Sequence, residues 1–404
     1  MDRSKRKTGR INKQKGLVLV LVTAAMTALV GVAAFSVDVN HALMNQTRLQ
    51  NSVDSAALAA AVVVANGGST ASATTAANNT LTGMANAAGN SEMDFSSATI
   101  SVQYSNDPTT FPDGSFSTVN DTFVRVSITN YELTTYFMDI FGVDKIITSS
   151  AVAGPSANLV EVCNLVPMAV CAGPDGGATG YTAGNLYALK SSSPGSSPMG
   201  PGNFQLLDFG SGASTIRTAL AGDYAGCVTI GDTVTTKPGN NVGPVGQGLN
   251  TRFDVYSGGG LSADDYPSDI YVKEPDTLAV LENDNSITYD DGWGYSDYIA
   301  EAPNCTGDAD CRADSGGKSN RRVVQVPIVN CSGATGGTTS LNVEAIGCFF
   351  LLQQAPTSNG SKQPVFGEYV QECFVPNGSF GNGSGTGEGP YRIVLYNDPL
   401  SDNS

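Results

Sequence analysis

The sequence predicts an α+β protein in which a long N-terminal helix packs on a small antiparallel sheet, followed by a β-rich domain that contains disulfides. Three observations predict this class. An apolar run of 21 residues opens a helical pattern that continues without Pro to about residue 65. Alternating strand-like segments follow as far as residue 155, and all eight cysteines lie beyond it. The expected divisions are a basic tail (1–16), the helix (17–66), a small α+β unit (67–155) and a β-rich region with long loops (156–404).

The apolar run, residues 17–37, is long enough to cross a membrane. At 1.5 Å per residue it spans about 31 Å, the thickness of a bilayer's hydrocarbon core. It carries no charged residue before Asp38. The expected anchor residues are its large apolar members, Leu17, Val18, Leu19, Leu21, Met26, Leu29, Val32, Phe35 and Val37.

The charges before this run predict its direction. Seven basic residues and one acid, Asp2, precede Leu17, and a short basic flank stays in the cytoplasm. A cleaved signal peptide with a site at Val32-Ala33-Ala34 is the alternative, although 21 residues exceed the 7–15 of a signal core. Cleavage after Gly16 by a prepilin peptidase is disfavoured, because Leu21 stands where a mature pilin carries glutamate.

The helix continues beyond the membrane with an amphipathic pattern. An apolar stripe recurs mostly at three- and four-residue steps: Leu43, Leu49, Val53, Ala56, Ala60 and Val64. Either the protein's own domain or a partner helix must cover it. Gln46, Gln50 and Asp54 share another face, where they can hydrogen-bond to one another or to a partner. His41 is interpreted as a polar residue of the membrane interface rather than as a ligand.

The segments from 69 to 155 predict a small sheet against the helix. Residues 69–90 are rich in Ala, Thr and Asn and indicate one weakly packed helix or two fragments. Residues 98–104, 123–129 and 145–152 predict strands, with a short amphipathic helix expected at 133–141. This order favours an antiparallel sheet packed on the long helix.

Several motifs of the N-terminal region occur together. They are Gly16 closing the basic flank, Asp38 between two valines, Arg48-Leu49-Gln50, and Asp54 opening the segment DSAALAAA. The combination resembles the N-terminal region of the TadG-like (TadE/TadG-like) proteins of Flp/Tad pilus assembly, over about residues 10–155. The resemblance implies a pilin-like helix and sheet, and a membrane-anchored structural component, minor-pilin-like or an assembly factor.

The same resemblance implies a setting for the protein. Together with the basic flank, it places the chain in the bacterial inner membrane, with the N-terminus cytoplasmic and the bulk periplasmic or at the cell surface. The expected partners are other Tad/Flp pilus-assembly proteins or minor pilins, and no enzymatic activity or cofactor is implied. The alternative is a surface or pilus-tip adhesin whose β-rich C-terminal domain binds a host surface or a glycan.

The cysteines predict disulfides. The eight are Cys163, Cys171, Cys227, Cys305, Cys311, Cys331, Cys348 and Cys373. An even number in an exported region favours pairing, and the absence of C-x-x-C disfavours a metal site. Proximity in the sequence suggests only two pairs, Cys163 with Cys171 and Cys305 with Cys311. The predicted strands of this region are 159–162, 165–171, 186–190, 321–329, 341–352, 365–374 and 391–396.

Charge and composition disfavour two classes of function. Without its first 15 residues the chain has 14 basic and 36 acidic residues, a formal charge of −22 that disfavours nucleic acid as a partner. The single histidine disfavours a His-dependent nucleophilic mechanism.

Four weaker sequence signals do not indicate a catalytic or metal site. Asp290, Asp291 and Asp297 form an acidic loop, interpreted as solvated rather than as a glycosidase or carbohydrate site. Calcium at 282–291 or 307–310 is a minor alternative, and Asp208, Ser211 and Ser214 lack the spacing of a metal-dependent adhesion motif. The glycine-rich stretch near 381 is interpreted as a flexible connection.

Overall fold

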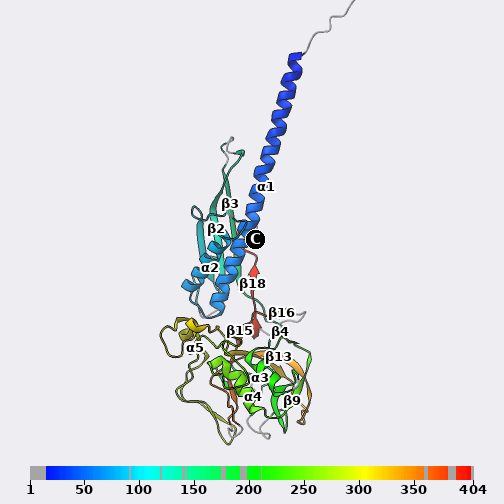
Figure 1. Cartoon of the computed structure of the whole chain (residues 1–404), viewed down its shortest axis with the longest axis vertical. Helices are drawn as coiled ribbons and strands as arrows, with labels where there is room; N and C mark the ends of the chain where they lie inside the picture. Colours follow the sequence, from blue (N-terminus) through cyan, green and yellow to red (C-terminus); the bar gives the residue numbers. More distant parts are fainter. Residues whose placement is uncertain are drawn as a thin grey trace, which may run out of the picture.

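A computed structural model of the chain describes residues 15–401 except 91, 119–120, 139–141, 143, 174–178, 192–197, 211, 359–362 and 381–387. Most of the basic tail, Ser211 and most of the glycine-rich stretch near 381 therefore lie outside the described residues, and for residues 15–17 only the backbone is described. A long helix rises from a small sheet unit packed along its lower half, and a β-rich domain lies beyond its C-terminal end (Figure 1).

Helix α1 runs from Lys15 to Ala65, 51 residues, or about 77 Å. The glycines after it end the helix. Gly67 has a φ of +79°, and its N–H donates to the carbonyl of Val64, while that of Gly68 donates to Val63. A β-carbon on Gly68 would lie 2.5 Å from Cγ1 of Val63, so this turn requires glycine.

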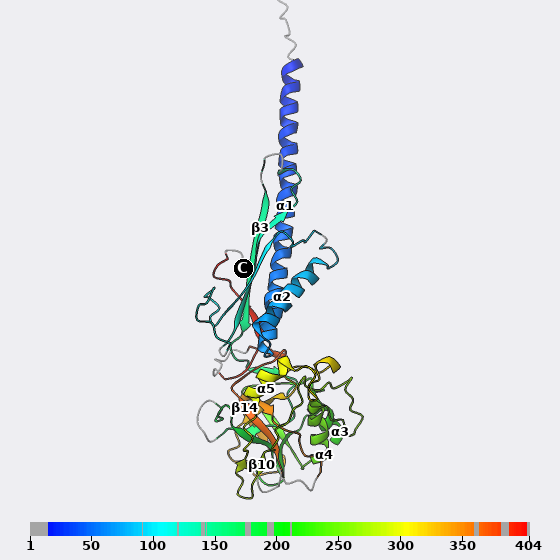
Figure 2. The same ribbon diagram turned by 90° about the vertical axis from the view of Figure 1, so that its left-hand side faces the viewer.

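Helix α2 (Thr70–Ala85) turns back against α1. Its N-cap is Ser69, whose hydroxyl accepts a hydrogen bond from the N–H of Ser72. Its buried residues are Ala73, Ala77 and Leu81, and Figure 2 shows the helix lying beside the lower part of α1. The segment is thus a single helix.

The first sheet contains β1 (Thr99–Ser105), β2 (Phe123–Leu133), β3 (Lys145–Pro155) and β18 (Ile393–Tyr396), in that order and antiparallel throughout. Val124, Val126 and Ile128 alternate along β2 and are fully buried toward the helices. The fourth strand comes from near the C-terminus and pairs with residues 152–155 of β3. The sheet therefore combines strands that follow α2 with one strand from the far end of the sequence.

The short helix expected at 133–141 is wrong for the residues described. Strand β2 continues to Leu133, because a bulge between Ile128 and Tyr131, with Asn130 at a φ of +56°, lets the strand continue with Tyr131 and Leu133 buried. Residues 134–137 are irregular, Met138 has a 3-10 conformation, and 139–141 lie outside the described residues.

The apolar stripe on α1 is covered by the protein's own domain. Leu49, Val53, Ala56 and Ala60 are 0 % exposed and pack with α2 and the sheet, and Val64 is half-buried. Leu43 is 61 % exposed. Six residues separate it from Leu49, or about 600° of helical rotation, so the two cannot share a face.

The β-rich region contains many short elements. Its strands are β4 (Glu161–Cys163), β5 (Val170–Cys171), β6 (Leu186–Lys190), β7 (Asn203–Leu207), β8 (Cys227–Thr229), β9 (Thr233–Pro238), β10 (Val280–Leu281), β11 (Ile287–Thr288), β12 (Val323–Val329), β13 (Ser340–Leu351), β14 (Val365–Val370), β15 (Glu372–Phe374), β16 (Gly378–Ser379) and β17 (Gly389–Tyr391). Its α-helices are α3 (Ala213–Ala221), α4 (Val242–Leu249) and α5 (Tyr295–Glu301). The central sheet has the order β5-β12-β13-β14-β6, extended by β9 and β7.

All eight cysteines form disulfides. The pairs are Cys163–Cys227, Cys171–Cys331, Cys305–Cys311 and Cys348–Cys373. The pair predicted within residues 305–311 is confirmed, whereas the pairing of Cys163 with Cys171 is wrong. Strand pairing is the reason: β4 lies antiparallel to β8, which places Cys163 opposite Cys227, and β5 lies parallel to the end of β12, just before Cys331.

Candidate functional site

A buried ion pair lies on α1 directly after the apolar run of residues 17–37. Asp38 is fully buried, and its Oδ1 atom is 2.8 Å from Nζ of Lys145, the first residue of β3. The backbone N–H groups of Tyr136, Phe137 and Met138 also donate to this carboxylate, at 3.1, 2.8 and 2.8 Å. One side chain of the helix thus binds both strand β3 and the segment after β2.

These donors keep Asp38 charged. Burial by itself raises the pKa of the carboxyl, but the hydrogen bond from Lys145 and the three backbone N–H groups hold the pKa well below its usual range. Consecutive N–H groups that point at one carboxylate form an anion-binding concavity.

A second polar layer extends from Lys145 to Glu92. The ammonium of Lys145 is 3.1 Å from Nδ1 of His41, and because an ammonium only donates, Nδ1 must be the acceptor. The hydrogen then sits on Nε2 of His41, which donates to Glu92 at 2.9 Å and lowers the pKa of Glu92. The ring of Tyr136 covers this layer, 5.0 Å from the ammonium and edge-on to His41.

The amides on the neighbouring face of α1 bind the backbone of β3. Gln46 donates to the carbonyl of Thr148 at 2.9 Å, and Gln50 donates to the carbonyl of Ser150 at 3.0 Å. Gln50 also donates to Asp54. The polar face noted in the sequence therefore docks the helix on the protein's own sheet, next to the stretch of β3 that pairs with β18.

We name the group formed by Asp38, His41, Glu92, Tyr136 and Lys145 the exit clamp. The donors and acceptors of these side chains bind one another. The exit clamp therefore holds α1 against the hairpin that strands β2 and β3 form. The sequence identified Asp38 and His41 as separate features. It missed Lys145, which lies 107 positions from Asp38 and carries no signal that would pair the two.

Two of the three acidic loop residues bind backbone N–H groups of their own region. Asp291 accepts a hydrogen bond from the N–H of Thr277 at 2.9 Å, whereas Asp297 caps α5 by accepting from the N–H of Gly294 at 3.0 Å. These carboxylates hold separate turns and the start of a helix.

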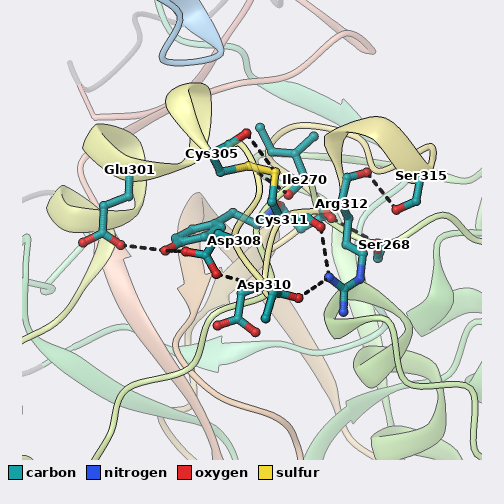
Figure 3. The surroundings of a disulfide bond; sticks show 12 residues. Ser268, Ile270, Glu301, Cys305, Asp308, Asp310, Cys311, Arg312 and Ser315 are labelled. Carbon is teal, nitrogen blue, oxygen red and sulfur yellow. Dashed lines mark hydrogen bonds between the residues drawn. A yellow bond between two sulfur atoms is a disulfide. The ribbon is translucent and has the colours of Figure 1, made fainter.

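The second acidic stretch, residues 307–310, lies in the loop that the Cys305–Cys311 disulfide closes (Figure 3). Asp308 accepts from the hydroxyl of Tyr271 at 3.3 Å and from the N–H of Asp310 at 2.9 Å. Among the described residues, the one group of three His, Cys, Asp or Glu side chains with ligand atoms within 4.8 Å of one another is Glu161 with Cys163 and Cys227. Both of its sulfurs are in a disulfide.

A cleft of about 280 Å³ lies between the end of α1 and the β-rich domain. Val64, Asp121, Tyr391 and Glu372 line it. Burial, followed by the charge of Asp121, raises the pKa of Glu372 to about 6, and burial raises the pKa of Asp121 as well.

Replacing Glu372 by Gln should remove part of the pH dependence of stability. Because its folded-state pKa of about 6 exceeds the usual 4.5, the wild type gains stability as pH falls through this window, and the carboxylate destabilises the fold above it. We expect Glu372→Gln to unfold at a higher temperature than the wild type at pH 7.5, with the difference shrinking at pH 4.5. Glu282→Gln, at an exposed position, is the control. Equal shifts in both variants would contradict the assignment.

The fold defines a protein with one N-terminal apolar helix, consistent with a single-pass membrane anchor. Its most apolar window of 18 residues has a mean hydropathy of 2.5, and no residue of that window is buried within the described part of the chain. The family model described as putative Flp pilus-assembly TadE/G-like matches residues 16–77. The match confirms the resemblance to this family and covers α1 and half of α2. No curated protein and no solved structure matches the chain.

Proposed function

We propose that this protein is a structural component of Flp/Tad pilus assembly, minor-pilin-like or an assembly factor, rather than an enzyme. The observation that carries the proposal is the TadE/G-like match, which coincides with the apolar helix and its docked continuation. The family is one of pilus assembly, and the described geometry is that of an anchor and a scaffold.

The proposed topology is a single pass through the inner membrane with a cytoplasmic N-terminus. The seven basic residues before Leu17 support this direction, since basic flanks remain in the cytoplasm. The four disulfides support an oxidising compartment for the β-rich domain.

The structure supports a role in which α1 holds the β-rich domain away from the membrane. From Asp38 to Ala65 the helix extends about 42 Å, and the domain lies beyond its end (Figure 1). Asn320 of that domain donates to the side chain of Asn66 at 2.8 Å, directly after α1. Because the protein's own sheet covers the stripe around Val53, we place partner contacts on other surfaces.

The test is loss of pili when the gene is deleted in the native bacterium, with recovery on expression of the wild-type chain. A periplasm-dependent reporter fused after Ser404 should be active. Recovery of the chain with the inner membrane supports an assembly factor, whereas its presence on sheared pili supports a minor pilin or a tip adhesin. Normal piliation in the deletion strain would contradict a role in assembly.

A further inference from the structure

Exposed apolar side chains lie near the end of the apolar run on α1. They belong to the β2–β3 hairpin, as Tyr136 (48 % exposed), Phe137 (42 %) and Ile146 (51 %). Val37, the last residue of the apolar run, is 51 % exposed, and the backbone N–H of Phe137 binds its neighbour Asp38.

The exit clamp fixes the height of these side chains along α1. The N–H groups of residues 136–138 bind Asp38, the first residue after the apolar run, and Lys145 binds the same carboxylate. The hairpin also points along α1 toward the apolar run (Figure 1). Residues 136–138 therefore lie level with the end of the apolar run.

We propose that Tyr136, Phe137 and Ile146 lie in the interfacial layer of the bilayer that α1 crosses, as a second contact of this protein with lipid. The proposal rests on the membrane anchor of the proposed function. Aromatic side chains favour the headgroup level of a membrane, where an apolar ring and a polar tip are both accommodated. Two polar groups of this end bind within the protein, since the Tyr136 hydroxyl is 3.4 Å from Glu92 and Lys145 binds Asp38. Asp144 is exposed, as a charged group at the headgroup level can be.

The exposed surface formed by Tyr136, Phe137 and Ile146 is continuous with the apolar run of α1. This favours lipid over a protein partner as the molecule that contacts it. The apolar run has no buried residue in its most apolar window, so the surface next to the hairpin is the one that the proposed anchor presents to lipid. A helix alone is free to rotate about its axis and to tilt. Placing Tyr136, Phe137 and Ile146 in the interface would remove this freedom and set one orientation for the β-rich domain.

Tryptophan fluorescence in vesicles tests the contact. The chain has one tryptophan, Trp293, which is 8 % exposed and lies in the β-rich domain. We would reconstitute the full chain carrying Phe137→Trp into phosphatidylcholine vesicles with lipids brominated near the headgroup. At least about half of the emission that the substitution adds should be quenched, as expected for a ring at interfacial depth. The wild type gives the baseline.

Phe380→Trp is the matched control, because Phe380 is 50 % exposed and follows β16 in the β-rich domain. Its added emission should be unaffected by brominated lipid. Ile146→Trp repeats the test on the other arm of the hairpin if Phe137→Trp folds poorly. Absence of quenching at both hairpin positions would overturn the proposal.

One further measurement separates this result from the proposed function. Each variant should first resist alkaline extraction from the vesicles, which reports insertion of α1. Extraction of all variants would overturn the anchor and the lipid contact together, whereas retention without quenching would overturn the lipid contact alone. Piliation does not enter the measurement.

Discussion

Replacing Ala56 by Glu should detach α1 from its own sheet and leave the N-terminal unit largely unfolded. Ala56 is 0 % exposed, in a cluster of small and apolar side chains from α1, α2 and β2. A carboxylate there would be buried without a partner, and removing it from water costs about 4 kcal/mol or more. That is a large share of the stability of a domain of this size.

The measurement is thermal unfolding of the purified chain in detergent, together with its level in cells. Asn51→Glu is the control, because Asn51 lies on the exposed face of the same helix five residues away. We expect the control to match the wild type. A stable Ala56→Glu protein that nevertheless fails to support piliation would instead indicate that the stripe docks a partner.

Replacing Lys145 by Met should have the second-largest effect. Lys145 is 6 % exposed and makes the one side-chain ion pair that the structure shows for buried Asp38 among the described residues. Losing one partner of a buried pair leaves the other charge uncompensated, which destabilises the fold by about 3–5 kcal/mol. Membrane insertion should be unaffected, because residues 17–37 are unchanged.

The double substitution Asp38→Asn with Lys145→Met should recover part of this loss. The amide oxygen of Asn can still accept hydrogen bonds from the N–H groups of Phe137 and Met138, which bind one carboxylate oxygen of Asp38. The N–H of Tyr136 loses its acceptor, so the recovery is partial, but the buried carboxylate is gone. A cycle of the two single variants and the double variant, measured by unfolding, gives the coupling energy. A coupling near zero would show that the ion pair does not hold the hairpin.

Local patterns predicted most of the N-terminal elements. The helix, its end at Gly67 and the strands at 98–104, 123–129 and 145–152 follow from periodicity and from glycine at the turn. The expected helix at 133–141 failed where an Asn in the left-handed conformation extended β2 through a bulge. Such a bulge depends on burial of Tyr131 in the assembled core rather than on local preference.

The partners of these elements required the tertiary structure. The stripe on α1 indicated that some surface must cover it, but only the fold shows that α2 and the sheet do so. The disulfide of Cys163 depends on the pairing of β4 with β8, which brings together residues 64 positions apart. Pairing across such distances depends on the global fold, because chain entropy favours the near neighbours that sequence proximity suggests.

The sequence by itself determined the apolar run, the charge asymmetry around it, the even number of cysteines and the motif at Asp38, because each is a property of neighbouring residues or of composition. The tertiary structure decided what Asp38 binds, which face of α1 is covered and that β18 completes the first sheet. Asp38 and Lys145 are ordinary charged residues until folding removes both from water, and only then does each require the other.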